Sequence, residues 1–277
     1  MYHKIALAIA FSPRMEALIA EAKRLKDIFG TELVLIHVGE KTEALESKLN
    51  DTLDKVGLDP IAVKTIWEPG KPAKKILQVC DAEQVDLLVA GALKSESLVN
   101  YYIGSIARKI IRKSKCSVLT LIEPLEKPTP FSKVVINGTQ HEQTPFVIEK
   151  GLDWCKIDGA KQVHVVNEIK MYGMKMATAG EGSEEEVSSV RKKLVAEEIT
   201  YVEDILKTMD KGVLKVNVKI TCGKWAIELA KFAEDIKADL LIVGDEGKLG
   251  FLDRLFPHDL EEILSNLPCN LLIIKKS

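Results

Sequence analysis

Val85-Asp86-Leu87-Leu88-Val89-Ala90-Gly91 and Ala238-Asp239-Leu240-Leu241-Ile242-Val243-Gly244 are two copies of one pattern, an acidic residue followed by an apolar run that ends at glycine. The two copies belong to a longer repeat that continues in the same register without a gap. Its further matched pairs are Gly70-Lys71 with Gly223-Lys224, Ala73 with Ala226, and Cys116 with Cys269. Because so many identical residues are separated by the same number of positions, the sequence predicts two copies of one domain fused in tandem.

Strand-like and helix-like runs alternate through each copy. In the first copy the predicted strands are residues 5–10, 33–38, 62–67, 87–90 and 117–122, and the predicted helices include residues 14–29, 45–56 and 72–82. The run at 87–90 is apolar throughout, which is typical of a strand covered by helices on both faces. This order predicts an α/β fold in which each domain has a parallel sheet and crossover helices.

A proline-rich stretch separates the two copies. Residues 123–130 read Glu-Pro-Leu-Glu-Lys-Pro-Thr-Pro. Proline lacks the backbone donor that helices and sheets require, so this stretch is expected to be a linker. The predicted organisation is a first domain at 1–125, a linker at 126–130 and a second domain at 131–277.

The second copy carries an insertion near residues 168–200. Between Gly159 and Gly223 there are about two dozen more residues than between the matching Gly30 and Gly70. The insertion contains the Met- and Gly-bearing stretch 171–182 and then a predicted helix that opens at Ser183. The apolar stripe predicted for this helix consists of Val187, Val190, Leu194, Ile199, Val202, Leu206 and Met209. Two interpretations stay open, a mobile lid over a ligand site and a plain surface insertion.

Composition and charge exclude several classes of protein. The net charge of −2 arises from 39 basic and 41 acidic residues that are mixed along the chain, so no nucleic-acid or membrane partner is expected. No apolar run reaches membrane-spanning length, and the N-terminal apolar run is too short for a signal peptide, which together predict a cytoplasmic protein. The five cysteines form no close pair, so they are expected to be buried, reduced thiols, and no metal site is predicted.

The loop after the fourth strand of each copy has the composition of a phosphate-binding loop. The first copy has Gly91-Ala92-Leu93-Lys94, nine residues, then Gly104-Ser105, and the second has Gly244-Asp245-Glu246-Gly247, nine residues, then Pro257-His258. Glycine at the end of a strand lets backbone amides approach an anion closely. A Gly-Ser pair at the start of a helix adds free amides, a hydroxyl and the positive helix end.

These features together resemble the universal stress protein family. Nucleotide-binding members of that family carry a glycine, two residues, a second glycine, nine residues, and then Gly-Ser or Gly-Thr. The resemblance also covers Ser12-Pro13 after the first strand, the helix start at 70–73 and the cysteine that opens the last strand. It implies two tandem Rossmann-like domains of the adenine-nucleotide alpha-hydrolase-like type, each an open five-stranded parallel sheet. The last strands, 118–122 and 271–274, would meet as in a dimer of single-domain members, and a further homodimer stays open.

Neither copy keeps the full set of nucleotide ligands found in the family. The family's binding aspartate after the first strand falls on Ala10 in one copy and on Asn137 in the other. Lys94 replaces the second loop glycine of the first copy, where its ammonium would contact a phosphate or its side chain would fill the space. The candidate binding residues that the resemblance implies are Ser12, Gly91, Lys94, Gly104, Ser105, Asn137, Gly244, Gly247 and His258.

The leading hypothesis is a stress-response protein that binds an adenine nucleotide such as ATP, with Mg²⁺ if so, in one domain and acts as a sensor or regulator. No set of residues suited to catalysis is evident, so binding of the nucleotide without turnover is expected. One alternative is a slow nucleotide hydrolase, in which a cation bound at Asp245-Glu246 would assist the reaction. The other alternative is a scaffold whose nucleotide sites have decayed.

Overall fold

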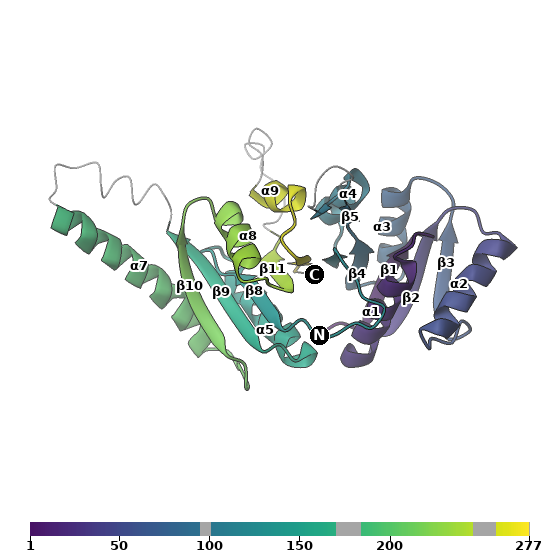
Figure 1. Ribbon diagram of the computed structural model, residues 1–277, viewed down its shortest axis with the longest axis horizontal. Coiled ribbons are helices and arrows are strands. Elements are labelled where there is room, and N and C mark those ends of the chain that lie inside the picture. The colour runs from purple at the N-terminus through teal and green to yellow at the C-terminus, as the bar shows by residue number, and fades with distance from the viewer. Residues whose placement is uncertain (95–100, 170–183, 246–258, 277) are drawn as a thin grey trace. The chain divides into compact units, whose positions relative to one another are not determined.

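The computed structural model describes residues 1–94, 101–169, 184–245 and 259–276 (Figure 1). The chain divides into two compact units, Met1–Pro130 together with Asn270–Ser277, and Phe131–Cys269. The proline-rich stretch 123–130 lies within the first unit. Within the described ranges, no helix is both long and apolar enough to cross a membrane.

The first unit contains a sheet in the order β12-β7-β4-β1-β2-β3. Its strands are β1 (Lys4–Ile9), β2 (Glu32–Val38), β3 (Lys64–Glu68), β4 (Leu87–Gly91), β7 (Ser117–Leu121) and β12 (Asn270–Ile274). The five strands from β1 to β7 pair in parallel, and β12 adds to β7 in the antiparallel direction. The five-stranded parallel sheet and the α/β fold predicted from the sequence are confirmed.

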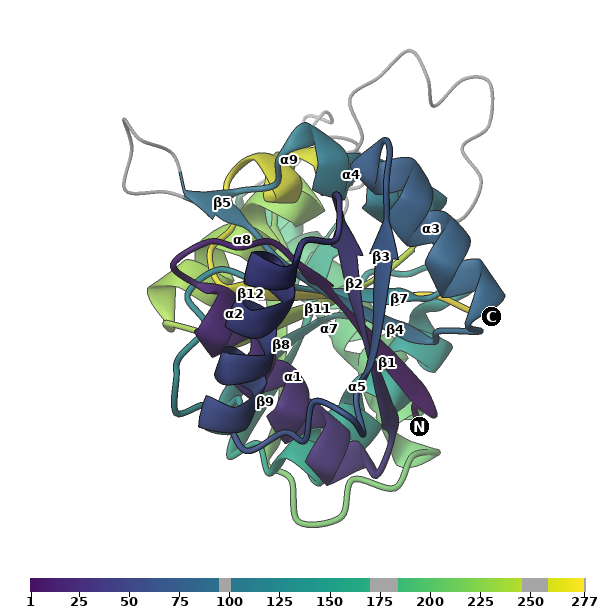
Figure 2. The same cartoon turned by 90° about the vertical axis from the view of Figure 1, so that its right-hand side faces the viewer.

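Helices cover both faces of this sheet. They are α1 (Met15–Phe29), α2 (Glu43–Lys55), α3 (Pro72–Ala82) and α4 (Ser105–Lys113). Figure 2 shows α1 and α2 on one face and α3 and α4 on the other. A short hairpin of β5 (Leu93–Lys94) and β6 (Tyr101–Tyr102) precedes α4. Double coverage explains why β1 and β4 are apolar almost throughout.

Local sequence signals set the ends of these helices. Gly30 ends α1 in the left-handed conformation, with φ of 63°, where a residue without a Cβ is favoured. The Thr42 hydroxyl accepts a hydrogen bond from the Leu45 amide at 3.3 Å and so caps the start of α2. Pro72 stands in the first turn of α3, where the missing amide costs nothing.

The second unit repeats this order. It contains β8 (Lys133–Asn137), α5 (Thr144–Asp158), β9 (Gln162–Ile169), α7 (Glu184–Lys207), β10 (Val216–Cys222), α8 (Trp225–Asp235), β11 (Leu240–Gly244) and α9 (Asp259–Ser265). Its four strands lie in the order β10-β9-β8-β11 and pair in parallel. The fifth strand of the repeat, β12, is counted with the first unit because it pairs with β7.

The aspartate of the repeated pattern has a structural role in both units. The Asp86 carboxylate accepts hydrogen bonds from the amides of His3 at 2.7 Å and Lys4 at 3.1 Å, at the start of β1. In the same way Asp239 accepts a bond of 2.8 Å from the Lys133 amide at the start of β8. In each unit the aspartate therefore holds the start of the central strand, β1 or β8, beside the strand that begins directly after the aspartate, β4 or β11.

The C-terminal strand is held firmly within the first unit. The backbone pairs Leu271 with Thr120 and Ile273 with Val118, which confirms the expected meeting of the two last strands. Beyond the strand, the buried Lys275 ammonium donates to the carbonyl oxygens of Ile111 at 2.6 Å and Ser114 at 2.8 Å. These carbonyls lie at the carboxyl end of α4, where a cation is favoured.

The insertion adds length to α7, which has 24 residues, whereas the matching α2 has 13. The part of α7 near its end packs on β9 and β10 and buries Val202 and Leu206, as the predicted stripe requires. Val190 is 38% exposed, because the earlier turns extend beyond the packed part of the helix. The stretch 171–182, Ser183 and therefore the choice between lid and surface insertion lie outside the described residues.

One prediction about the cysteines was wrong. Cys222 is exposed, whereas the other four cysteines are buried and all five are free thiols. Cys222 is the last residue of β10, which is the edge strand of the second unit, so its side chain reaches solvent at the end of the sheet.

Candidate functional site

The two units share a topological feature, a switch point beside the central strand. From β1 the sheet continues to β2 on one side and to β4 on the other, and β8 stands in the same way between β9 and β11. The loops that leave these neighbouring strands diverge to opposite faces. Ligands of open parallel sheets bind at such a switch point, outside the carboxyl ends of the strands.

In the second unit an open pocket with a cavity volume of about 70 Å³ occupies this position. Asn137, the last residue of β8, and Gly244, the last residue of β11, both line it. The remaining lining residues are Thr139, Gln140, His141, Gln143, Thr144, Val147 and Asp245. The structure therefore brings two of the sequence-predicted site residues together in one pocket.

The loop after β8 is ordered by the Asn137 side chain. Its Oδ1 atom accepts hydrogen bonds from the Thr139 amide at 3.2 Å and from the Thr139 hydroxyl at 2.8 Å. The Thr144 hydroxyl donates in turn to the Thr139 carbonyl and links the loop to the first turn of α5. The sequence reasoning missed both threonines, although the two-residue spacing from Asn137 to Thr139 is typical of a turn in which an asparagine side chain accepts from the backbone.

Gly244 is required by close packing at the end of β11. A Cβ atom at this position would lie 2.6 Å from the Cγ2 atom of Val147 in α5. Gly138, directly after β8, is similarly constrained, because its Cβ would lie 2.7 Å from the Cγ1 atom of Val165. Gly244 therefore lines the pocket with backbone alone, beside the carboxylate of Asp245, which adds negative charge.

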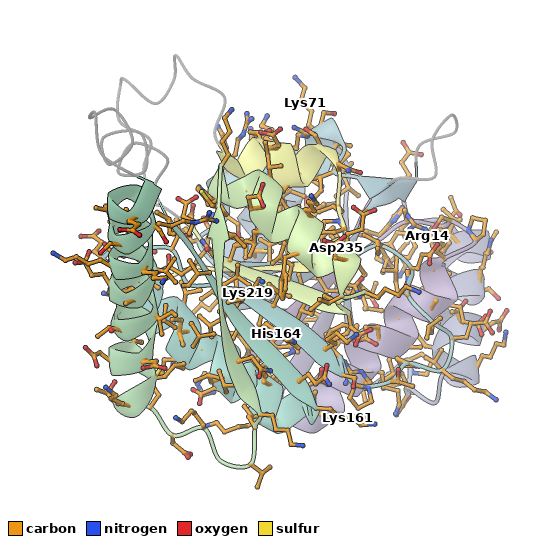
Figure 3. All side chains as sticks on the ribbon, turned by 60° about the vertical axis from the view of Figure 1, so that its left-hand side comes forward. Arg14, Lys71, Lys161, His164, Lys219 and Asp235 are labelled. Carbon is orange, nitrogen blue, oxygen red and sulfur yellow. The ribbon has the colours of Figure 1, made fainter. Side chains whose placement is uncertain are left out.

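In the first unit Arg14 lies at the corresponding switch point. Arg14 follows β1 in the loop before α1 (Figure 3). Its guanidinium donates hydrogen bonds to the carbonyl oxygen of Ala92, after β4, and to that of Ile122, after β7, the latter at 2.9 Å. Gly91 lies beside it, since a Cβ there would be 3.7 Å from an Arg14 nitrogen. Arg14 therefore bridges three loops with one side chain, and the sequence reasoning missed this role.

Aromatic side chains cover the other part of that edge. Phe11, His37 and Trp67 lie at or near the carboxyl ends of β1, β2 and β3. Their ring centroids are separated by 5.0 Å for Phe11 and His37, and by 4.9 Å for His37 and Trp67. The rings pack against one another, so the protein's own side chains lie over the carboxyl ends of β1, β2 and β3.

The remaining predicted site residues are dispersed or lie outside the described ranges. Ser12 is exposed in the loop after β1, two residues before Arg14. Gly104 precedes α4 and Ser105 is its exposed first residue, while Lys94 belongs to the β5–β6 hairpin. Gly247 and His258 fall between residues 246 and 258, which the structure does not describe. Among the residues that are described, no three His, Cys, Asp or Glu side chains gather as a metal site.

Comparison with known proteins identifies the family. The sequence pattern of the universal stress protein family matches twice, over residues 1–121 and 135–275, and so covers both units almost completely. The chain belongs to the universal stress protein family. The double match shows that this is a tandem universal stress protein, as the internal repeat predicted.

Relatives of this universal stress protein agree in sequence and fold. A universal stress protein of Methanocaldococcus jannaschii is 32% identical over 178 residues, which are 64% of this chain and 92% of that protein. The crystal structure of a universal stress protein from Archaeoglobus fulgidus aligns over 99% of this chain and 98% of its own, with 14% identity and a TM-score of 0.68. A functionally unknown protein from Pseudomonas aeruginosa aligns over 99% and 92%, with 15% identity and a TM-score of 0.71. At these identities the structural likeness establishes the fold.

Proposed function

We propose that the second unit binds one adenine nucleotide, with ATP as the expected ligand, and that the protein acts as a sensor or regulator in the stress response of the cytoplasm. The observation that carries the proposal is the contrast between the two switch points. The pocket beside Asn137 and Gly244 is open, whereas Arg14 bridges the equivalent loops of the first unit. One site per chain is therefore expected.

Two of the lining residues have suitable roles toward a nucleotide. Gly244 allows the ligand to approach the backbone at the end of β11. Asn137 uses its Oδ1 atom to order the loop, and its amide nitrogen supplies donors for a ribose hydroxyl. This amide takes the place of the aspartate that nucleotide-binding family members carry there, so hydrogen bonding is kept without the charge.

The charge of the pocket favours a metal-bound nucleotide. The Asp245 carboxylate would repel a bare triphosphate at close range. A magnesium ion between the phosphates and this carboxylate would reverse that effect, and Mg²⁺ prefers oxygen ligands of this kind. We therefore expect ATP to bind with Mg²⁺ and to bind more weakly when the metal is removed with a chelator.

Thermal unfolding in the presence of Mg²⁺ and ATP tests this function. At a ligand concentration of about 100 times Kd, a ligand that binds only the folded state adds about 2.7 kcal/mol, enough to raise Tm by several degrees. The rise is expected to disappear in the Asn137→Ala variant, which loses the side chain at the end of β8. The Ser12→Ala variant, changed at an exposed site of the first unit, is the matched control and should keep the full rise.

Two outcomes would contradict the proposal. One is no change in Tm of the wild-type protein at millimolar ATP, ADP or AMP. The other is a rise that the Asn137→Ala variant retains in full, because the nucleotide would then bind elsewhere. Mass spectrometry of small molecules released on denaturation provides a second readout, since a retained adenine nucleotide identifies the ligand directly.

A further inference from the structure

Helices α3 and α4 of the first unit pack side by side on one face of the sheet (Figure 2). Their apolar residues belong to one buried cluster, to which α3 contributes Ala73 and Ile76 and α4 contributes Ile110. An amphipathic helix turns its polar residues away from the side that it buries. The outer sides of α3 and α4 therefore form one shared surface, which we call the α3–α4 face.

Most charged side chains on the α3–α4 face are cations. The face has four exposed lysines to which the described residues give no ion pair, namely Lys71, Lys74, Lys109 and Lys113. Figure 3 shows the Lys71 side chain pointing away from the ribbon. Both helices are described in full, and their only acidic residue is Asp81, whose carboxylate lies 2.8 Å from the Lys115 ammonium. The face is therefore positively charged, although the chain as a whole has a net charge of −2.

Helix stability does not account for most of these lysines. The start of a helix is the positive end of its dipole, where acidic residues are favoured and cations are not. Lys71 is the N-cap residue of α3 and Lys74 lies in its first turn, so both stand where a cation is unfavourable. Lys113 in the last turn of α4 complements the dipole, but Lys109 lies a full turn earlier. Three of the four lysines therefore gain nothing from their own helix dipoles.

The second unit shows that the fold does not require this charge. Three of the lysines are matched there by exposed residues that are not cations. The matched pairs are Lys74 with Ile227, Lys109 with Glu262, and Lys113 with Asn266. The buried positions stay apolar in both units, since Ala73 matches Ala226 and Ile110 matches Ile263. The helices therefore pack in the same way without the three cations, which are a property of the first unit.

The composition of the α3–α4 face determines which anionic partner fits it. Protein partners bind around an apolar or aromatic centre, and helices that insert into a membrane surface need a wide apolar side. Neither α3 nor α4 contains an aromatic residue, and the large apolar side chain that α4 exposes is Ile106, at 47%. Single-stranded nucleic acids bind largely by stacking on aromatic rings. The phosphate backbone of a duplex, in contrast, requires only an array of cations.

We propose that the α3–α4 face binds the phosphate backbone of double-stranded nucleic acid without regard to its sequence. Each helix carries two lysines about one turn apart, and packed helices lie about 8–10 Å from each other, so four ammonium groups are available to neighbouring phosphates. The even mixture of charges along the chain predicts no such partner, because it does not reveal that two helices bring their lysines together. The face belongs to the first unit and the proposed nucleotide pocket to the second, so either proposal can fail without the other.

Fluorescence anisotropy with a short labelled DNA duplex measures this binding in the full chain. Four contacts between lysine and phosphate give a slope of about −3.6 when the logarithm of the binding constant is plotted against the logarithm of the salt concentration. The affinity should therefore fall roughly a hundredfold between about 50 and 200 mM salt. A second duplex of unrelated sequence should bind with the same affinity, because phosphate contacts carry no sequence information.

A double variant of α4 tests the face directly. Lys109→Glu with Lys113→Asn introduces the residues that the second unit has at the matched positions, so the fold should be retained. Loss of two phosphate contacts is expected to weaken binding at low salt at least about tenfold and to reduce the slope to about −1.8. The matched control is Lys192→Glu with Lys193→Asn, which makes the same change of charge at two exposed lysines of α7 and should alter neither quantity.

The proposal would be overturned if the wild-type chain does not bind the duplex at low salt, or if the α4 variant and the α7 control lose affinity equally. Tighter binding to poly-glutamate or to vesicles containing phosphatidylserine, compared at equal concentrations of charge, would also overturn it, in favour of an acidic protein or a membrane. Lys74→Gln, which should make the slope shallower by about one, provides the same test if the double variant does not fold.

Discussion

Replacing Gly244 with alanine is expected to weaken the binding of Mg²⁺ and ATP by at least about tenfold. The added methyl group would keep the ligand away from the backbone of β11 and would displace the wall of the pocket. The added Cβ would lie 2.6 Å from Val147 Cγ2, a separation that packed carbon atoms do not tolerate. Either α5 or the end of β11 must therefore shift, and both line the pocket. Isothermal titration calorimetry measures the affinity, and thermal unfolding without ligand verifies that the variant is folded.

The matched control for this substitution is Gly91→Ala in the first unit. Gly91 ends β4 as Gly244 ends β11, but its Cβ would lie 3.2 Å from a terminal carbon of Leu18, so a small movement accommodates it. The control variant should bind with wild-type affinity. Loss of binding in Gly91→Ala, together with full binding in Gly244→Ala, would move the site to the first unit. If Gly244→Ala does not fold, the Asn137→Ala variant tests the same pocket.

A chain that ends at Cys269 is expected to lose the stability of the first unit. It lacks β12, whose four apolar residues from Leu271 to Ile274 are all at most 2% exposed. Burial of such side chains contributes about 1.5–3 kcal/mol each. The total approaches the whole stability of an ordinary domain, about 5–15 kcal/mol. The truncation also exposes the edge of β7, which is apolar and unprotected by charge.

Urea unfolding and size-exclusion chromatography measure the effect of this truncation. We expect a much lower unfolding midpoint for the first unit and association of chains through the exposed strand. Removing only Lys276 and Ser277 is the control, since Lys276 is exposed and Lys275 and the strand remain. A truncated chain that stays monomeric and unfolds at the wild-type midpoint would show that β12 contributes little to the first unit.

The features that repeat in the sequence are the ones that it predicted well. The pattern around Asp86 and Asp239 identified the tandem architecture, and the structure adds the reason for the aspartate, which binds the amides at the start of the central strand. Pro72 at the first turn of α3 and Gly30 at the end of α1 set those helix ends by backbone chemistry alone. Such local signals can be read without knowledge of the fold.

Features that depend on distant segments could not be predicted. Arg14 bonds to carbonyls 78 and 108 residues further along the chain, and no local pattern marks the approach of those loops. The burial of Cys222 was predicted incorrectly because an apolar strand does not reveal that it lies at the edge of a sheet. The predicted helical stripe is confirmed at Val202 and Leu206, but Met209 lies beyond the end of α7 at Lys207, and the point at which α7 leaves the packed surface depends on β9 and β10.

The central claim is that one nucleotide binds per chain and that it binds in the second unit. The most direct measurement is the stoichiometry of Mg²⁺ and ATP in a calorimetric titration of the wild-type, Gly244→Ala and Gly91→Ala proteins at equal concentration. The account predicts about one site per chain in the wild-type and Gly91→Ala proteins, and a weakened or absent site in Gly244→Ala. Two sites per chain, no site, or a single site unaffected by Gly244→Ala would contradict it.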